Sequence, residues 1–259
     1  MKVDMNLAKE AAIEAGKVIL KYYKADYEIE EKGYHNPVTT ADKKADETIK
    51  KVLMTATPEY GWLSEETKDS SLRLKKKFVW IVDPIDGTKE FIKGVPEFVV
   101  SIALVKEGEP IVGVIFNPVK KEMFVAAKKM GSFLNGSKIK CTSKERISNM
   151  SILNSRSELK RGDWNKYIDT FGKLSSVGSV AYKLALTAAG KGDVFISLRP
   201  KNEWDICAGN CIINEAGGEL VDLNGKGRKY NLKNTLIDSG IIAGQSKTVN
   251  KILPVVKIK

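Results

Sequence analysis

The sequence is poor in the residues that build disulfide frameworks and zinc sites. It has three cysteines and a single histidine, His35, in 259 residues. A small, odd number of cysteines in a long chain does not make a disulfide framework. Cys207 and Cys211 fall on one expected helix, but no second pair of cysteines or histidines completes a zinc site. We therefore expect the cysteines to be small buried side chains.

Long apolar runs are also missing. No stretch approaches the roughly 18 residues that a membrane span requires. The N-terminus, Met-Lys-Val-Asp, leads into a helix with charges of both signs rather than into an apolar signal core. We expect a cytoplasmic protein without a membrane partner.

The net charge is +11, although hydrophobic residues (42%) and charged residues (29%) occur at levels usual for a globular protein. Lysine and arginine are spread along the chain, and no familiar nucleic-acid-binding motif is present. A positive field attracts nucleic acids, but it also speeds the encounter with a small anionic substrate. We favour the small anion and expect no nucleic-acid partner.

One short segment concentrates acidic residues directly after an apolar run. Residues 78–82 predict a buried strand that ends at Asp83, because Pro84 cannot donate to a strand ladder. Asp83 and Asp86 then share one turn with the Ile85 carbonyl. These oxygens repel one another unless a hard cation such as Mg²⁺ joins them. The alternative is that both aspartates merely cap a turn.

Four strings resemble one family of enzymes. Asp-Pro-Ile-Asp-Gly-Thr at residues 83–88 resembles the signature of the inositol monophosphatase superfamily of Mg²⁺-dependent, lithium-sensitive phosphatases. The continuation Lys-Glu-Phe at 89–91 is similar to the 3′(2′),5′-bisphosphate nucleotidase branch, the CysQ type. The other strings, in the family's order, are Pro-Val-Thr-Thr-Ala-Asp at 37–42, Ser-Glu-Glu at 64–66, and Trp-Asp-Ile-Cys-Ala-Gly at 204–209 followed by Glu-Ala-Gly-Gly at 215–218.

The resemblance implies sites for two to three Mg²⁺ ions. Glu65, Asp83 and the Ile85 carbonyl would hold one ion. Asp83, Asp86 and Asp205 would hold a second, and a third, weaker ion would lie near Glu65. For Asp205, a simpler role as a helix cap stays open.

The resemblance also implies a catalytic group of Asp42, Glu65 and Thr88. Asp42 would accept a hydrogen bond from Thr88, which helps to activate the attacking water. The N–H groups of Gly87 and Thr88 would bind phosphate oxygens. By residue type alone, a helix cap is favoured over catalysis for Asp42, and Thr40 is the other candidate cap of the helix that follows.

The substrate is the least determined part of the assignment. Inositol phosphatases of this superfamily carry an acid shortly before the Trp-Asp pair, where this chain has Leu198 and Arg199. The Lys-Glu-Phe string points instead to 3′-phosphoadenosine 5′-phosphate. Ser179, at a helix start, would lie near the substrate. Lys183 and Arg199 are candidate partners for the second phosphate, and both could equally be solvated surface charges.

Three alternatives to the nucleotidase stay open. An inositol-1-phosphate phosphatase or a fructose-1,6-bisphosphate phosphatase would use the same metals with another pocket. A non-enzymatic nucleic-acid-binding protein on the same scaffold would explain the charge but not the acidic residues. The sequence allows a monomer or a homodimer.

The expected fold has two lobes within one compact unit, residues 1–259. The lobe at 1–145, which carries most ligands, begins with a helix over 3–24 and contains an antiparallel meander of strands near 98–105, 111–116 and 122–127. The lobe at 146–259 carries Asp205 and the substrate pocket, and there strands alternate with helices, one of them over 163–171. The resemblance implies an αβαβα layered sandwich of the α+β and α/β classes.

Overall fold

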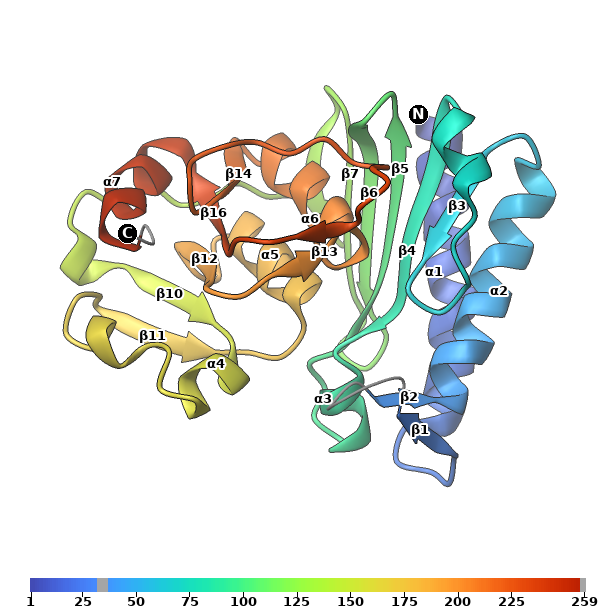
Figure 1. Ribbon diagram of the computed structural model, residues 1–259, viewed down its shortest axis with the longest axis horizontal. Coiled ribbons are helices and arrows are strands. Elements are labelled where there is room, and N and C mark those ends of the chain that lie inside the picture. The colour runs from blue at the N-terminus through green and yellow to red at the C-terminus, as the bar shows by residue number, and fades with distance from the viewer. Residues whose placement is uncertain (32–36, 257–259) are drawn as a thin grey trace.

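The computed structural model describes residues 1–31 and 37–256, so His35 lies outside the described residues. Helices and sheets alternate in five layers (Figure 1). Helices α1 (Lys2–Tyr22) and α2 (Thr40–Ala56) cover one face of a large sheet. Helices α5 (Val180–Ala188) and α6 (Glu203–Glu215) lie between this sheet and a second one, whose far side is covered by α7 (Ser246–Val256). This arrangement confirms the predicted αβαβα sandwich.

The large sheet comes from the first half of the chain. Its strand order, within the described residues, is β3-β4-β5-β6-β7-β8-β9, and every neighbouring pair is antiparallel except β3–β4. The expected antiparallel meander is therefore confirmed. The strands are β3 (Gly61–Ser64), β4 (Phe78–Asp86), β5 (Val99–Lys106), β6 (Glu109–Asn117), β7 (Glu122–Ala127), β8 (Gly131–Leu134) and β9 (Ser137–Lys138).

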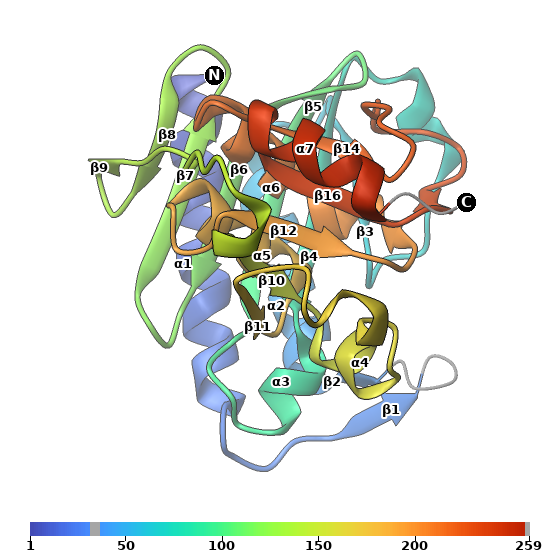
Figure 2. The same ribbon diagram turned by 90° about the vertical axis from the view of Figure 1, so that its left-hand side faces the viewer.

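The second sheet comes from the later half and has the order β11-β10-β12-β16-β14 (Figure 2). Strand β10 is parallel to both of its neighbours, whereas β16 is antiparallel to β12 and β14. Parallel pairs alternating with helices confirm the α/β character expected for this half. The strands are β10 (Ser151–Asn154), β11 (Lys173–Ser176), β12 (Val194–Ser197), β14 (Gly218–Asp222) and β16 (Ile241–Gln245).

Short elements complete the fold. In the part of the chain that the structure describes, two pairs of strands lie outside these sheets, β1 with β2 and β13 with β15. These strands are β1 (Ile29–Glu31), β2 (Pro37–Thr39), β13 (Lys201–Asn202) and β15 (Leu236–Ile237). The described residues also form the short helices α3 (Thr88–Ile92) and α4 (Arg156–Lys160), and the 3₁₀ turns η1 (Ser71–Lys75), η2 (Ile147–Asn149) and η3 (Asn165–Tyr167).

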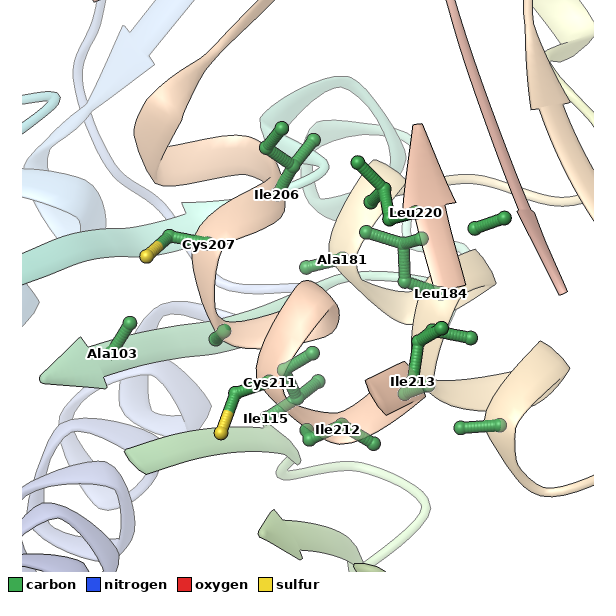
Figure 3. Close-up of a cluster of buried hydrophobic side chains, with 14 of the residues drawn as sticks. Ala103, Ile115, Ala181, Leu184, Ile206, Cys207, Cys211, Ile212, Ile213 and Leu220 are labelled. Atoms are coloured by element: carbon green, nitrogen blue, oxygen red, sulfur yellow. The ribbon is translucent and has the colours of Figure 1, made fainter. Parts of the chain in front are cut away.

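The central helix layer joins the two sheets through one hydrophobic core. Side chains of α5 and α6 pack against strand residues of both sheets, among them Ala103, Ile115 and Leu220 (Figure 3). Cys207 and Cys211 lie on α6 in this core with exposed fractions of 0% and 2%. They are therefore buried small side chains, as expected, and Cys141 is partly buried.

Strand β4 differs from the prediction at its functional end. It does not stop at Asp83 but continues to Asp86. The pairing with β5 runs to Asp83 and resumes at Asp86 with a shifted register. Pro84 is tolerated because the irregularity removes the need for its missing N–H. The two aspartates that the prediction placed on a turn therefore lie on β4, on either side of the shift in register.

The prediction of a helix over residues 163–171 is wrong. Over these residues the chain forms the 3₁₀ turn η3, and the preceding helix α4 ends at Lys160. Gly162 adopts φ +78 after α4, and Trp164 is buried in a third core between the second sheet and α7. Burial of the aromatic side chains here overrides the helical spacing on which the prediction depended.

The structure also addresses the possibility of a membrane span. Among residues 1–31 and 37–256, no helix combines the length and the apolar character that crossing a bilayer requires.

Candidate active site

A cavity of about 470 Å³ brings together most of the residues singled out in the sequence. Its wall is formed by the ends of β3 and β4, the turn before α3, and the N-terminal ends of α4, α5 and α6. Two sets of charged residues line it. The acidic group consists of Glu65, Asp83 and Asp205, and the basic group of Arg156, Lys183 and Lys201. Three further charged residues line the cavity, namely Asp86, Lys89 and Glu90.

The acidic group converges from three separate segments. Asp83 lies on β4, Glu65 directly follows β3, and Asp205 lies in the first turn of α6. Each offers one carboxylate oxygen, and these three oxygens lie within 4.8 Å of one another. The parallel pairing of β3 with β4 explains part of this, since it places Ser64 beside Val82 and so their following acids side by side.

Burial and mutual repulsion disfavour the charged forms of these acids. Burial raises the pKa of Asp83 well above its usual range, and the charges of Glu65, Asp86 and Asp205 raise it further. Burial likewise raises the pKa of Asp205 to about 8, with Asp86 and Glu65 adding to the effect. A cation bound among these oxygens would reverse this preference.

The donor set fits a hard divalent cation. Oδ1 of Asp83 is buried and has no hydrogen-bond partner among the described residues. A buried carboxylate oxygen without a partner is costly unless a ligand completes its contacts. Carboxylate oxygens, with carbonyls and water, are the ligands that Mg²⁺ prefers. The acidic group can therefore hold Mg²⁺, with the Ile85 carbonyl in the same wall.

Asp86 stands apart from the three converging oxygens. Its Oδ2 accepts hydrogen bonds from Ser179 Oγ at 2.6 Å and from the backbone N–H of Ala181. Both donors belong to the N-terminal end of α5, so an acid of the first half of the chain is bound by the second half. Burial raises the pKa of Asp86, and these hydrogen bonds oppose the rise.

Ser179, which donates to Asp86, has an unusual backbone conformation. Its φ is +58, which side chains other than glycine rarely adopt. Lys183 Nζ donates to the carbonyls of Val177 and Ser179 at 2.9 and 2.5 Å, and so ties the turn from both sides. Burial lowers the pKa of Lys183 to about 8. Both residues line the cavity, although Lys183 is already bonded to backbone oxygens.

Thr88 and Asp42 form the hydrogen bond that the sequence predicted. Thr88 Oγ1 lies 3.0 Å from Asp42 Oδ1 and 3.1 Å from the Ile85 carbonyl oxygen. A hydroxyl has one proton, so it donates to one of these acceptors at a time. Asp42 Oδ2 accepts from the N–H of Thr39 at 2.7 Å and from its hydroxyl. Burial raises the pKa of Asp42 to about 6 against these hydrogen bonds.

Both simpler roles for the aspartates also hold. Asp42 completes a capping box with Thr39, which is the N-cap in place of Thr40. Asp205 Oδ2 accepts from the N–H of Asn202 at 2.8 Å at the start of α6. In each case the helix cap fixes the direction of the carboxylate. Asp42 also bonds Thr88 and Asp205 also lines the cavity, so the cap and the proposed role are compatible.

Gly87 makes the sharp turn between β4 and α3. Its φ is +103, and a Cβ there would lie 2.9 Å from the carbonyl oxygen of Glu97. Glycine is therefore required for the chain to bring the Thr88 hydroxyl back toward Ile85.

Arg199 does not join the cavity. Its Nη2 lies 2.7 Å from Asp163 Oδ1 on the surface, its side chain is 53% exposed, and it is not among the residues that line the cavity. The contact expected between Arg199 and the substrate is therefore not supported, and the surface role considered for it is the one observed.

Arg156 lines the cavity, and sequence reasoning did not single it out. Its guanidinium pairs with Glu90 at 3.4 Å and with Glu97. The available signal was its position directly after β10, because ligands of α/β sheets bind beyond the carboxyl ends of parallel strands.

Comparison with known proteins gives consistent relationships. Residues 2–257 match the model of the inositol monophosphatase family. The chain is 34% identical to inositol-1-monophosphatase of Rhizobium meliloti (strain 1021) over 233 residues, 86% of this chain and 87% of the relative. It is 33% identical to Nus factor SuhB of Escherichia coli (strain K12) over 261 residues, 96% of this chain and 94% of the relative.

Solved structures give the same relationships. The crystal structure of extragenic suppressor protein suhB from Bartonella henselae superposes with a TM-score of 0.87 at 30% identity, covering 98% of both chains. The crystal structure of CysQ from Bacteroides thetaiotaomicron has a TM-score of 0.77 at 31% identity, covering 95% of this chain and 97% of that one. The similarity to SuhB is thus at least as close as the similarity to CysQ.

Proposed function

Because this chain belongs to the inositol monophosphatase family and is a phosphatase of that family, we propose that it is a Mg²⁺-dependent 3′(2′),5′-bisphosphate nucleotidase. The observation that carries the metal-dependent chemistry is the convergence of Glu65, Asp83 and Asp205 around a buried oxygen of Asp83 that lacks a partner among the described residues. The proposed reaction converts 3′-phosphoadenosine 5′-phosphate and water into AMP and phosphate.

The proposed ligands account for two to three ions. Glu65, Asp83 and the Ile85 carbonyl would hold one, and Asp83, Asp86 and Asp205 a second. A third ion would bind more weakly near Glu65. Bound Mg²⁺ supplies charge neutralisation for the phosphate dianion and lowers the pKa of coordinated water.

The residues of the chain then position water and phosphate. When Thr88 donates a hydrogen bond to Asp42 Oδ1, its oxygen lone pairs can accept a hydrogen bond from the attacking water and orient it. The N–H groups of Gly87 and Thr88 donate to phosphate oxygens. Water attacks phosphorus opposite the ester oxygen, the P–O bond to the leaving alcohol breaks, and that oxygen takes up a proton.

The basic group supports a substrate with a second phosphate. Arg156, Lys183 and Lys201 line the same cavity as the acidic group, so a doubly phosphorylated ligand can meet cations at both of its anionic ends. Ser179, at the start of α5, lines the same cavity. The net charge of +11 favours the approach of such an anion, and a small anionic ester, not nucleic acid, is the proposed partner.

Inositol 1-phosphate is the second candidate substrate. It is favoured by the Rhizobium meliloti relative, which is named inositol-1-monophosphatase and is 34% identical. Against it stands Leu198, where inositol phosphatases of the superfamily carry an acid.

A substrate panel separates these candidates. Phosphate release is measured with 3′-phosphoadenosine 5′-phosphate, inositol 1-phosphate and fructose 1,6-bisphosphate, with Mg²⁺ and with EDTA. We expect the highest kcat/KM for the nucleotide, and no phosphate release from any of the substrates without Mg²⁺. A preference for inositol 1-phosphate would replace the proposed substrate. No turnover of any ester, together with salt-sensitive RNA binding, would favour a nucleic-acid-binding protein.

Lithium adds a simple measurement to the same panel. We propose that Li⁺ inhibits the reaction, since the family resemblance includes lithium sensitivity. The measurement is phosphate release at fixed Mg²⁺ with increasing LiCl, and NaCl at matched ionic strength is the control.

A further inference from the structure

Helix α2 carries a second buried aspartate one turn beyond Asp42. Asp46 is 6% exposed, and both of its carboxylate oxygens are bonded. Oδ1 accepts a hydrogen bond from Ser64 Oγ, and Oδ2 accepts one from Thr67 Oγ1 at 2.6 Å. Hydrogen bonds to an ionised carboxylate are shorter and stronger than neutral ones, so this contact fixes both hydroxyls firmly.

The two hydroxyls flank the acids that follow β3. Ser64 ends the strand, Glu65 and Glu66 follow, and Thr67 comes next. The N–H of Glu65 donates to the Val82 carbonyl at 3.2 Å, and the N–H of Glu66 donates to Ser64 Oγ at 3.3 Å. One carboxylate therefore holds the segment from both ends, which restricts the positions that the Glu65 backbone can take.

Asp42 and Asp46 lie on the same face of α2, and each one holds a different part of the site. Residues four apart lie on one face of a helix, one turn from each other. Asp42 holds Thr88, and Asp46 holds the segment of Glu65. The helix itself is anchored by buried side chains, including Ile49 and Leu53. A rigid element thus sets the distance between the proposed water-orienting hydroxyl and a proposed metal ligand.

We propose that Asp46 is a positioning residue for Mg²⁺ binding, which acts by holding Glu65 where it meets Asp83 and Asp205. Without this contact, the segment from Ser64 to Thr67 is less restricted, and the additional ordering needed when the ion binds lowers the affinity. The inference rests on the proposed Mg²⁺-dependent function. Partners that orient metal ligands typically contribute about 10- to 100-fold to metal affinity.

The test measures Mg²⁺ binding by calorimetry in the absence of substrate. Asp46→Ala removes both contacts and is expected to weaken Mg²⁺ binding about 10- to 100-fold. Asp46→Asn removes the charge but can bond both hydroxyls, because a hydroxyl donates or accepts. It is therefore expected to keep Ser64 and Thr67 in place and to bind Mg²⁺ with an affinity close to that of the wild type.

Asp193 offers a matched control for the loss of a buried carboxylate. It is 4% exposed and accepts hydrogen bonds from Thr142 Oγ1 at 2.6 Å and from the N–H of Ser151 at 2.7 Å. It joins two segments as Asp46 does, but neither of these segments carries a proposed metal ligand. Asp193→Ala is expected to lower the melting temperature and to leave the Mg²⁺ affinity unchanged.

Thr67→Val and Thr67→Ser keep the test available if Asp46→Ala does not fold. Valine removes the hydroxyl that reaches Oδ2, and serine retains it. We expect weaker Mg²⁺ binding in the valine variant alone.

Three results would overturn the inference. Wild-type affinity in folded Asp46→Ala or in Thr67→Val would show that the contact does not position Glu65. An equal loss in Asp46→Asn and Asp46→Ala would show an effect of charge and not of position. A wild-type protein that binds no Mg²⁺ would instead overturn the proposed function, and this inference with it.

Discussion

The acidic and basic groups of the cavity differ in how their charges are compensated. In the basic group, Arg156 pairs with two glutamates, while Lys183 and Lys201 each donate to two backbone carbonyls. In the acidic group, by contrast, burial raises the pKa of Asp83 and Asp205, and the charges of neighbouring acids raise it further. A bound cation would compensate these acids in their ionised forms, whereas the charges of the basic group already have partners and can contribute only moderate contacts to a substrate.

The largest effect should follow from removing a charge of the acidic group. We expect Asp205→Asn to reduce kcat/KM by more than about 100-fold, the upper range for residues that only orient a ligand. The metal-free variant should be at least as stable as the wild type, since the change relieves repulsion with Asp86 and Glu65. Steady-state phosphate release and thermal melting in EDTA test both statements. Retention of most Mg²⁺-dependent turnover would contradict the ligand assignment.

Removal of the Thr88 hydroxyl should come next. Thr88→Val is expected to lower kcat by about 100-fold, the lower range for groups that assist proton transfer. Mg²⁺ affinity should stay near that of the wild type, because the side chain is not among the proposed ligands. Thr88→Ser, which keeps the hydroxyl that donates to Asp42, is the control. If valine and serine variants are equally active, Thr88 does not orient the water.

The pH dependence of stability tests the compensation of the acidic group directly. The pKa of Asp205 is raised from 3.8 to about 8, so the folded protein holds this proton more tightly than the unfolded chain. Between these values unfolding releases protons, and the stability of the metal-free protein should fall as pH rises. Mg²⁺ requires ionised ligands, so its stabilising effect should grow over the same window.

Melting curves at both ends of this pH window, with EDTA and with Mg²⁺, test both predicted changes of stability with pH. At a tenfold excess over its dissociation constant, Mg²⁺ adds about 1.4 kcal/mol to the free energy of unfolding. A gap between the two melting temperatures that does not widen toward high pH would contradict the view that the ion compensates these acids.

The two groups also differ in how well the sequence predicted them. The acids, Thr88 and Asp42 lie in short strings whose local geometry is fixed by neighbours, such as the capping of α2 by Thr39 and the glycine turn at Gly87. The sequence therefore predicted the hydrogen bond between Thr88 and Asp42, and it named the three acids that the fold brings together. The five-layer fold was predicted through the same strings.

Long-range choices were not predictable in this way. Which arginine reaches the cavity depends on where Asp163, Glu90 and Glu97 lie in space. The helix expected over 163–171 failed for a similar reason, because burial of Trp164 in a distant core decides the local conformation. The extension of β4 to Asp86 depends on pairing with β5 beyond Pro84, which a rule about proline alone does not include.

A smaller effect is expected from the basic group. Arg156→Ala should raise the KM for 3′-phosphoadenosine 5′-phosphate about tenfold, which corresponds to about 1.4 kcal/mol. The expected effect is moderate because Glu90 and Glu97 already share the guanidinium. The KM for inositol 1-phosphate, which has one phosphate, should change less. Arg156→Lys tests the contribution of charge alone, and equal changes for both substrates would argue against a contact with the second phosphate.

The smallest effect is expected from Arg199, which the sequence had placed beside the substrate. Its guanidinium bonds Asp163 through Nε and Nη2 at 3.0 and 2.7 Å, on an exposed surface. Exposed ion pairs contribute about 0–1 kcal/mol, and Arg161 lies 3.2 Å from the same carboxylate and can replace part of the lost contact. Arg199→Ala should therefore leave KM for both substrates within about twofold of the wild type. A selective rise for the bisphosphate equal to that of Arg156→Ala would restore the original assignment, because only movement of Arg199 into the cavity could produce it.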